Sequence, residues 1–177
     1  MENLQLVQPS LDFAEEIRNY RAAFAHEHLH GGRSLSDIEN IADWIEHTQK
    51  ESNAATCRPD RAPSSTYLCI RQSDQKMVGI VNIRHHIEQE FLLNVAGHIG
   101  YSIHPAERRK GYATEQLLLA LNEAQKLGLT KVLITAADWN IGSQKTILAN
   151  GGVYEDTRID PSDGDRMLRY WINLSTN

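Results

Sequence analysis

The hydrophobic period of this sequence changes repeatedly along the chain, and the order of these changes restricts the fold more than any other feature. Runs of alternating or continuous apolar residues predict strands at 4–7, 66–72, 77–85, 96–104, 131–137, 153–159 and 166–174. Helical spacing predicts helices at 10–30, 36–52, 112–127 and 140–152, and the stretch 87–95 fits either a loop or an irregular helical turn. Interleaved helices and strands are typical of an α/β domain, so we expect a central mixed, mostly antiparallel sheet flanked by helices on both faces.

The first two helices carry their own boundary signals. Ser10 is a suitable N-cap for the helix over 10–30, and Gly31 ends that pattern. Ser36 and Glu39 have the spacing of a capping box, which predicts the start of the second helix.

Length and charge restrict the class of function. A chain of 177 residues suits one domain, which we place at 1–177. The net charge of −5 argues against nucleic acid or an anionic membrane as partner, because both attract basic surfaces. The sequence shows neither a membrane-spanning apolar run nor the pattern of a secretory signal. Its two cysteines lack metal-ligand spacing, so we expect reduced thiols in a cytoplasmic protein.

A basic cluster directly before a predicted helix is the strongest local indication of a ligand. Arg108, Arg109 and Lys110 precede Gly111, next to the positive end of that helix. The amides from Arg109 to Ala113 could form a concave donor surface for phosphate oxygens, with Arg108 bidentate and Lys110 a point charge. The pattern alone is weak, since about 0.2 chance matches are expected in such a chain. A solvated basic turn is the alternative.

Three stretches together resemble one family. The strings GHIGYSIHPAERRKGYATEQL (97–117), KVLITAADWNIGSQKTILANGG (131–152) and LRYWI (168–172) are similar to those of the GNAT superfamily of acyl-CoA-dependent N-acetyltransferases. The resemblance is specific from about Thr66 to Leu174, whereas in the first 65 residues only the order of elements agrees. It implies acetyl-CoA as co-substrate, with no metal, and a cofactor arm inserted between splayed strands at 97–104 and 131–136.

The resemblance also implies roles for residues around the basic turn and the following helix. The pyrophosphate would be held at 108–114, and an amide at or near Ile103 would hold the thioester carbonyl. The side chain of Asn140 would contact the cofactor arm, with Ser143 and Lys145 a turn further on. The candidate cofactor residues are therefore Ile103, Arg108, Arg109, Lys110, Gly111, Tyr112, Ala113, Thr114, Asn140, Ser143 and Lys145.

His98 is the candidate base for the acceptor amine. An alkylamine is mostly charged at pH 7, and only its neutral form can attack a carbonyl. Strand alternation places His98, Gly100 and Ser102 on one face, and an imidazole titrates near neutral pH. His98 also lies where the family often carries a glutamate in this role. A local hydrogen bond is the alternative role for this ring.

The group that would protonate the leaving thiol departs from the family pattern. The resemblance places a tyrosine four residues before the glycine that ends the helix at 140–152, and Ile147 and Leu148 occupy the two positions that this count allows. Tyr154 could substitute from the next strand, or it could be a packed strand aromatic. A thiol with a pKa of about 8.5 can leave as a thiolate, so a missing acid does not forbid catalysis.

The segment His26–His30 satisfies the H-E-x-x-H motif of helical zinc hydrolases. On a helix, His26 and His30 would share one face, with Glu27 beside them. Gly31 ends the helical pattern at the second histidine, and no further ligand follows at the spacing of related zinc proteases. A polar helix end is therefore the alternative to a metal site.

We therefore expect an enzyme that transfers an acetyl group from acetyl-CoA to a primary amine of a small molecule or peptide, by direct attack with base-assisted deprotonation. A non-catalytic acyl-CoA-binding module is the main alternative. A zinc hydrolase that uses His26, Glu27 and His30 is a further alternative. We expect no nucleic-acid or membrane partner, and a homodimer is left open.

Overall fold

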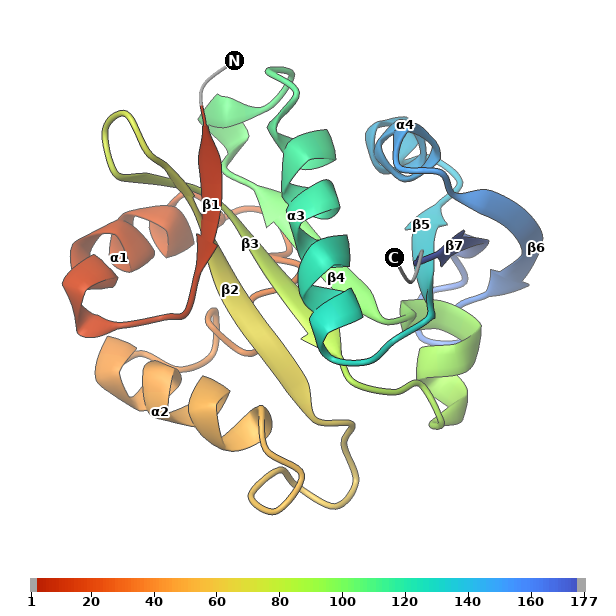
Figure 1. The fold of residues 1–177 in the computed structure, drawn as a ribbon, viewed down its shortest axis with the longest axis horizontal. Helices are drawn as coiled ribbons and strands as arrows, with labels where there is room; N and C mark the ends of the chain where they lie inside the picture. The colour runs from red at the N-terminus through yellow and green to blue at the C-terminus, as the bar shows by residue number, and fades with distance from the viewer. Residues whose placement is uncertain (1–2, 175–177) are drawn as a thin grey trace.

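The computed structural model describes residues 3–174. Its strands are β1 (Leu4–Val7), β2 (Ser64–Arg71), β3 (Lys76–Arg84), β4 (Ile99–Ile103), β5 (Lys131–Ala137), β6 (Val153–Ile159) and β7 (Arg166–Asn173). Its helices are α1 (Ala14–Ala22), α2 (Ile41–Glu51), α3 (Tyr112–Lys126) and α4 (Ile141–Ala149), with short turns η1 (Leu11–Phe13), η2 (Leu92–Ala96) and η3 (Pro105–Glu107). The α/β class expected from the sequence is confirmed (Figure 1).

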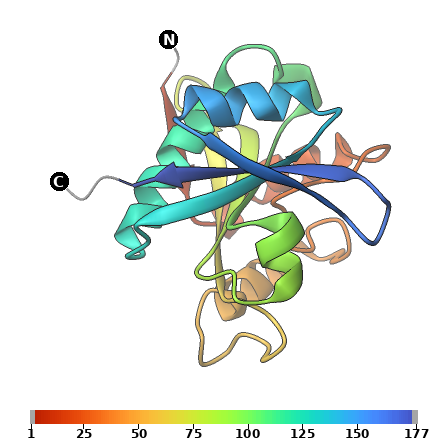
Figure 2. The same ribbon diagram turned by 90° about the vertical axis from the view of Figure 1, so that its right-hand side faces the viewer.

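The strands form two antiparallel sheets rather than one continuous sheet. The four-stranded sheet has the order β1-β2-β3-β4, and the three-stranded sheet has the order β5-β7-β6. In Figure 2 the three-stranded sheet crosses in front of the four-stranded one. The expected mixed arrangement is therefore divided at β4 and β5, the neighbouring strands that belong to different sheets.

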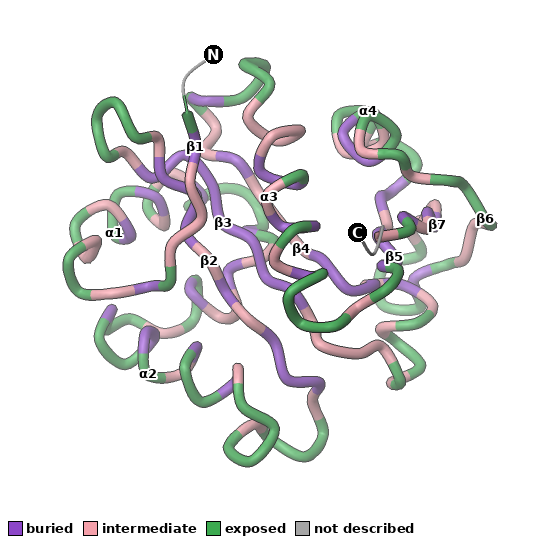
Figure 3. The backbone as a smooth tube through the Cα atoms, viewed as in Figure 1, coloured by how far each residue is buried: buried purple, intermediate pink, exposed green. Residues whose placement is uncertain are grey.

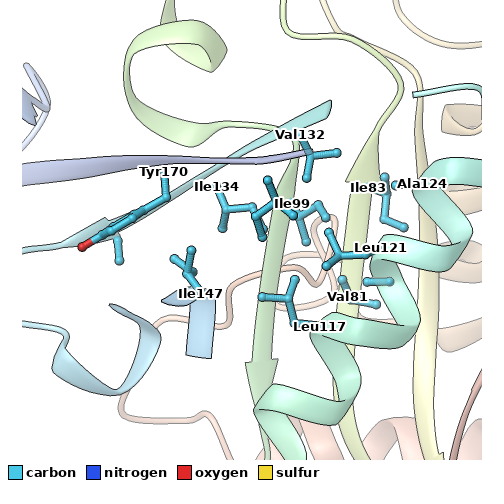
Figure 4. Close-up of a cluster of buried hydrophobic side chains, with 13 residues drawn as sticks. Val81, Ile83, Ile99, Leu117, Leu121, Ala124, Val132, Ile134, Ile147 and Tyr170 are labelled. Atoms are coloured by element: carbon cyan, nitrogen blue, oxygen red, sulfur yellow. The ribbon is translucent and has the colours of Figure 1, made fainter. Parts of the chain in front are cut away.

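Helices cover both faces of the four-stranded sheet, and buried residues gather in its central strands (Figure 3). Helices α1 and α2 pack on one face, where Ile17 and Trp44 are completely buried. Helix α3 packs on the other face, and its Leu117 belongs to a buried cluster that includes residues of both sheets and Ile147 of α4 (Figure 4). Burial of this apolar surface is the main force that holds α3 between the two sheets.

The expected helix over 10–30 is wrong in its second half, because α1 ends at Ala22 and the chain continues in turns. Phe24 and Leu29 are both 6% exposed, and an uninterrupted helix would point them about 140° apart. Turning the chain buries both side chains in the cluster that contains α1 and α2.

The second helix begins at Ile41, so the capping box expected at Ser36 is also wrong. Asn40 caps α2 instead, because its Oδ1 accepts hydrogen bonds from the amides of Ala42 at 2.8 Å and Asp43 at 3.2 Å. The carbonyls just before the cap are held by Arg21, whose Nη1 donates to them at 2.8 and 3.0 Å. This tertiary contact keeps them out of helical pairing.

The segment 87–95 before β4 was expected to form either a loop or an irregular helical turn. Its second half enters η2, a short π-helix, and Gly97 then adopts a φ of 65°, which no strand residue has. The strand expected over 96–104 is therefore shorter and begins at Ile99. Within residues 3–174, none of the helices has both the length and the apolar composition needed to cross a membrane.

Candidate cofactor and catalytic site

The two sheets are joined beside the start of β4. The amide of His98 donates to the carbonyl of Leu133 at 2.8 Å, and the amide of Leu133 donates to His98 Nδ1 at 2.9 Å. An imidazole nitrogen thus takes the place of the carbonyl that a continuing ladder would use. Beyond this join the two strands diverge toward Ile103 and Ala137, between α3 and α4 (Figure 1).

The turn between β4 and α3 presents backbone amides at a helix N-terminus. Arg109 and Gly111 have positive φ angles of 65° and 84°, and Gly111 is the N-cap of α3. Within residues 3–174, the amides of Arg109, Lys110, Gly111 and Ala113 have no acceptor in the protein. Such amides, at the positive end of a helix, bind phosphate oxygens. A Cβ at position 111 would meet nothing within 4 Å, so backbone conformation rather than space favours glycine there.

Glu107 fixes this turn, and no local spacing in the sequence indicates it. Its carboxylate is 4% exposed and pairs with Arg71 at 2.8 Å, Lys76 at 2.7 Å and Lys110 at 2.8 Å. Burial would raise the pKa of Glu107, but the hydrogen bonds from Lys110, Lys76 and Arg71 hold it at about 2. Lys110 is three residues away, whereas Arg71 and Lys76 come from the hairpin of β2 and β3, so only the fold brings these two to Glu107.

The three basic residues of the turn have different surroundings. Arg108 donates to Glu27 Oε1 at 2.9 Å and to the Ile103 carbonyl at 3.2 Å, so its guanidinium is already engaged. Lys110 is paired with Glu107, as described above. Arg109 is exposed and makes no ion pair with any residue in the described range. The structure therefore leaves Arg109 as the available cation, while direct phosphate contacts from Arg108 and Lys110 stay predictions.

A groove of about 740 Å³ begins at this turn and continues between α3 and α4. Residues 110–112 and Thr114 line it on one side, and Asn150 lines it on the other. Asn150 Nδ2 donates to the Thr114 carbonyl at 3.2 Å and so ties the end of α4 to the start of α3. Tyr112 and Thr114 are therefore placed beside the unpaired amides, in a space suited to an extended ligand.

The first turn of α4 also faces this region. Asn140 caps α4, because its Oδ1 atom accepts from the Ser143 amide at 3.1 Å. Ser143 Oγ in turn lies 2.9 Å from the hydroxyl of Tyr101 on β4. Lys145 is exposed on the same helix. Contacts of these side chains with a cofactor arm stay predictions.

His98 has the surroundings of a structural residue. The ring is 5% exposed, and Nδ1 is occupied by the Leu133 amide. Burial, and then the charges of Arg84 and His86, lower the pKa of His98 to about 4. The ring is therefore neutral at pH 7 and has little affinity for the proton of an alkylamine. The geometry favours the local hydrogen bond, and base duty for His98 stays a prediction.

The candidates for proton donation are widely separated. Ile147 is completely buried in the cluster of Figure 4, and Leu148 is 53% exposed. Tyr154 lies on β6, which β7 separates from β5, and its hydroxyl is 2.8 Å from Thr157 Oγ1. Its placement on the outer strand separates Tyr154 from the gap between β4 and β5, so its catalytic role also stays a prediction.

The alternative of a helical zinc motif at His26–His30 is wrong, because this segment lies beyond the end of α1. His26 and His30 are in turns and do not share a helical face. Instead Glu27 pairs with Arg108, and the His30 carbonyl accepts from Ser102 Oγ at 2.7 Å. Across residues 3–174 there is no group of three or more His, Cys, Asp or Glu side chains placed to hold a metal ion. The segment covers β4 rather than forming a metal centre.

Residues 3–153 match a family model described as an acetyltransferase (GNAT) domain. No curated protein matches the sequence. Among solved structures, the microcin C7 self-immunity acetyltransferase in complex with acetyl-CoA and AMP is 19% identical, with a TM-score of 0.66 over 98% of this chain and 94% of that one. A dodecameric spermidine N-acetyltransferase from Vibrio cholerae is 16% identical, with a TM-score of 0.63 over 98% and 94%.

A further solved structure is an acetyltransferase of the GNAT family from Bacillus anthracis. It is 16% identical, with a TM-score of 0.64 over 98% of this chain and 96% of that one. At these identities the likeness to solved structures concerns the fold, whereas the family model covers most of the sequence.

Proposed function

Because the chain belongs to the GNAT family of acetyltransferases, we propose that it transfers the acetyl group of acetyl-CoA to a primary amine. The observation that carries this proposal is that the amides of Arg109, Lys110, Gly111 and Ala113, at the start of α3, have no acceptor among residues 3–174. These amides suit a diphosphate, and the Arg109 side chain adds a positive charge beside them. The groove toward Asn150 gives room for the nucleotide portion.

The diverging strands suit the rest of the co-substrate. The edge of β4 that faces β5 forms no ladder with it beyond the join at His98. Backbone groups along this edge can therefore hydrogen-bond an extended pantetheine arm, as one strand would bond another. This placement would bring the thioester carbonyl toward the amide donors near Ile103. Fixed donors of this kind stabilise the oxyanion that forms during acyl transfer.

Positioning and charge stabilisation supply most of what this reaction needs from the protein. Holding amine and thioester together removes the entropy cost of their encounter. The amine must be neutral when it attacks, and the buried ring of His98 is a weak base for that purpose. We infer that the acceptor loses its proton to water or enters as the neutral amine, with His98 holding the strands in place.

The direct experiment is to mix the protein with acetyl-CoA and a panel of amines, and to follow release of free thiol. The panel includes spermidine, because one compared enzyme is a spermidine N-acetyltransferase, together with amino acids and a peptide with a free N-terminus. Thiol release that depends on one of these amines is expected. Tight CoA binding without thiol release for any amine would favour an acyl-CoA-binding module. The buried Ile147 is compatible with that alternative, because it occupies a position where the family pattern has a tyrosine.

Arg109→Glu tests the proposed anion site directly. We expect calorimetry to show that CoA binds at least about tenfold more weakly, since a repulsive charge replaces an attractive one beside the diphosphate. Arg18→Glu is the matched control, because Arg18 is an exposed arginine on α1. Equal affinities for CoA in the two variants would exclude the turn at 108–111 as the phosphate site.

A further inference from the structure

Tyr101 crosses the gap between the two halves of the fold. It lies in the middle of β4, and its ring packs against the buried cluster that α3 shares with both sheets. Its hydroxyl oxygen is 2.9 Å from Ser143 Oγ on α4. A phenol carried by the four-stranded sheet is thus held by a hydroxyl from the helix that follows β5.

The direction of these hydrogen bonds determines what Tyr101 can do. A phenolic oxygen accepts two hydrogen bonds and donates one. When Ser143 donates, the proton of Tyr101 is left for another acceptor. Burial raises the pKa of Tyr101, which hydrogen bonding partly offsets, and no charged side chain of residues 3–174 contributes to the shift. The hydroxyl is therefore protonated at neutral pH and acts as a donor.

We propose that the Tyr101 hydroxyl donates a hydrogen bond to the sulfur of the acetyl thioester while the carbon–sulfur bond breaks. This inference rests on the proposed function, which places the arm of acetyl-CoA along β4. The amine nitrogen attacks the carbonyl carbon, a nitrogen–carbon bond forms, and the electron pair of the broken bond leaves on sulfur. The proton that the amine loses passes to solvent. Tyr101 keeps its own proton, because a thiol is a stronger acid than a phenol.

Other hydroxyl groups near the site are less well placed. Tyr20 lies on the opposite face of β4, where its hydroxyl donates to the Ser102 carbonyl at 2.9 Å. Tyr154 is on the outer strand β6. Ser143 points at Tyr101 itself, at the 2.9 Å given above, so it supports the phenol. Tyr101 is therefore the phenol that faces the gap from β4.

The test compares the 177-residue chain with its Tyr101→Phe variant, using CoA as the probe. The ultraviolet absorbance of the thiolate reports the pKa of the bound CoA thiol without any turnover. We expect this pKa to be higher in Tyr101→Phe by about one unit, because the variant no longer stabilises the thiolate. We also expect kcat to fall on the order of tenfold, with little change in KM for acetyl-CoA.

Two further variants separate a chemical role from a structural one. Tyr67→Phe is the matched control, because Tyr67 packs against the same cluster from β2 and its loss should leave the thiol pKa unchanged. Ser143→Ala removes one of the groups that orient Tyr101 and should give a smaller shift of the same sign. If Tyr101→Phe folds poorly, the pKa of the bound CoA thiol is measured in Ser143→Ala instead.

The outcomes also distinguish this inference from the proposed function. If the unaltered protein fails to bind CoA, the proposed function is wrong. If it binds CoA and releases thiol, while Tyr101→Phe has the same thiol pKa and the same kcat, then only the assignment of Tyr101 is overturned.

Discussion

His98 shows how one side chain can replace a peptide group. Its Nδ1 accepts from the Leu133 amide while its own amide donates to the Leu133 carbonyl, so two residues complete a pair of hydrogen bonds between the sheets. An accepting Nδ1 requires the proton to be on Nε2 in the neutral ring. Protonating Nδ1 would break the bond to Leu133 and place a charge in a buried position.

Replacing His98 therefore separates structure from chemistry. We expect His98→Ala to lower the free energy of unfolding at pH 7 by roughly 1–3 kcal/mol, because the buried Leu133 amide loses its acceptor. His98→Asn offers the Leu133 amide a side-chain oxygen at a similar distance, so the free energy of unfolding should fall less in this variant. Denaturant unfolding and turnover are measured for both variants. Recovery of both quantities in His98→Asn means a structural role, whereas recovery of stability alone means that the ring takes part in the reaction.

The pH dependence of unfolding gives a second measurement of the same ring. Its folded-state pKa of about 4 lies below the 6.5 of a free histidine, so the unfolded chain binds the proton more tightly between these values. The contribution of His98 to the free energy of unfolding is complete above pH 6.5 and is lost as the pH falls toward 4. This contribution amounts to about 3 kcal/mol. The unaltered protein should therefore lose stability more steeply than His98→Asn over this window. Parallel curves would show that the ring is not buried in its neutral form.

At the scale of elements, the turn from β4 to α3 is tied to the β2–β3 hairpin through Glu107. Glu107→Gln leaves Arg71, Lys76 and Lys110 without their shared carboxylate, and we expect unfolding to become easier by roughly 2–4 kcal/mol. CoA affinity should fall as well, because the turn that carries the amides is no longer fixed. Denaturant unfolding and calorimetry measure the two effects.

Glu46→Gln is the control for that variant. Glu46 pairs with Lys50 on the exposed side of α2, with both side chains more than half exposed, so its loss should leave stability and CoA affinity unchanged. If the two variants behave alike, Glu107 does not hold the turn.

Local pattern predicted the elements with a clear apolar pattern, such as α3, which glycines bound, and the continuous apolar strand β5. It failed in the first half of the chain, where distant contacts decide. Phe24 and Leu29 draw the chain away from helical geometry, and the contacts of Arg21 delay the start of α2. These effects come from residues that are far apart in sequence, so a local window does not contain them.

The same limit applies to the candidate site. The amide-rich turn at 109–113 could be predicted, because a basic stretch with a glycine preceded a helix. Glu107 could not, since its partners include residues 71 and 76 on the hairpin of β2 and β3. The hydrogen bond between Tyr101 and Ser143 could not be predicted from the sequence either, because it depends on how the two sheets are placed.

At the scale of the whole molecule, a ligand in the gap between β4 and β5 would add contacts to both sheets. We expect CoA at one hundred times its dissociation constant to raise the free energy of unfolding by about 2.7 kcal/mol, provided that only the folded chain binds it. For a chain of this size the thermal midpoint should rise by roughly 5–10 °C.

Thermal unfolding with and without CoA measures this shift, and Arg109→Glu should show a smaller one at the same CoA concentration. A midpoint that CoA leaves unchanged would contradict the placement of the site. Hydrogen exchange locates the effect, since the amides at 109–111 and 113 should become protected first.

The pairing of Lys110 with Glu107, and of Arg108 with Glu27, has a consequence for how the site responds to ionic strength. Two of the three positive side chains at the turn are already neutralised by carboxylates, on a chain whose overall charge is −5. Attraction for a polyanion then comes mainly from peptide dipoles at short range, which added electrolyte screens poorly. Affinity should change little between dilute and physiological buffers, unlike that of a pocket built from free lysines.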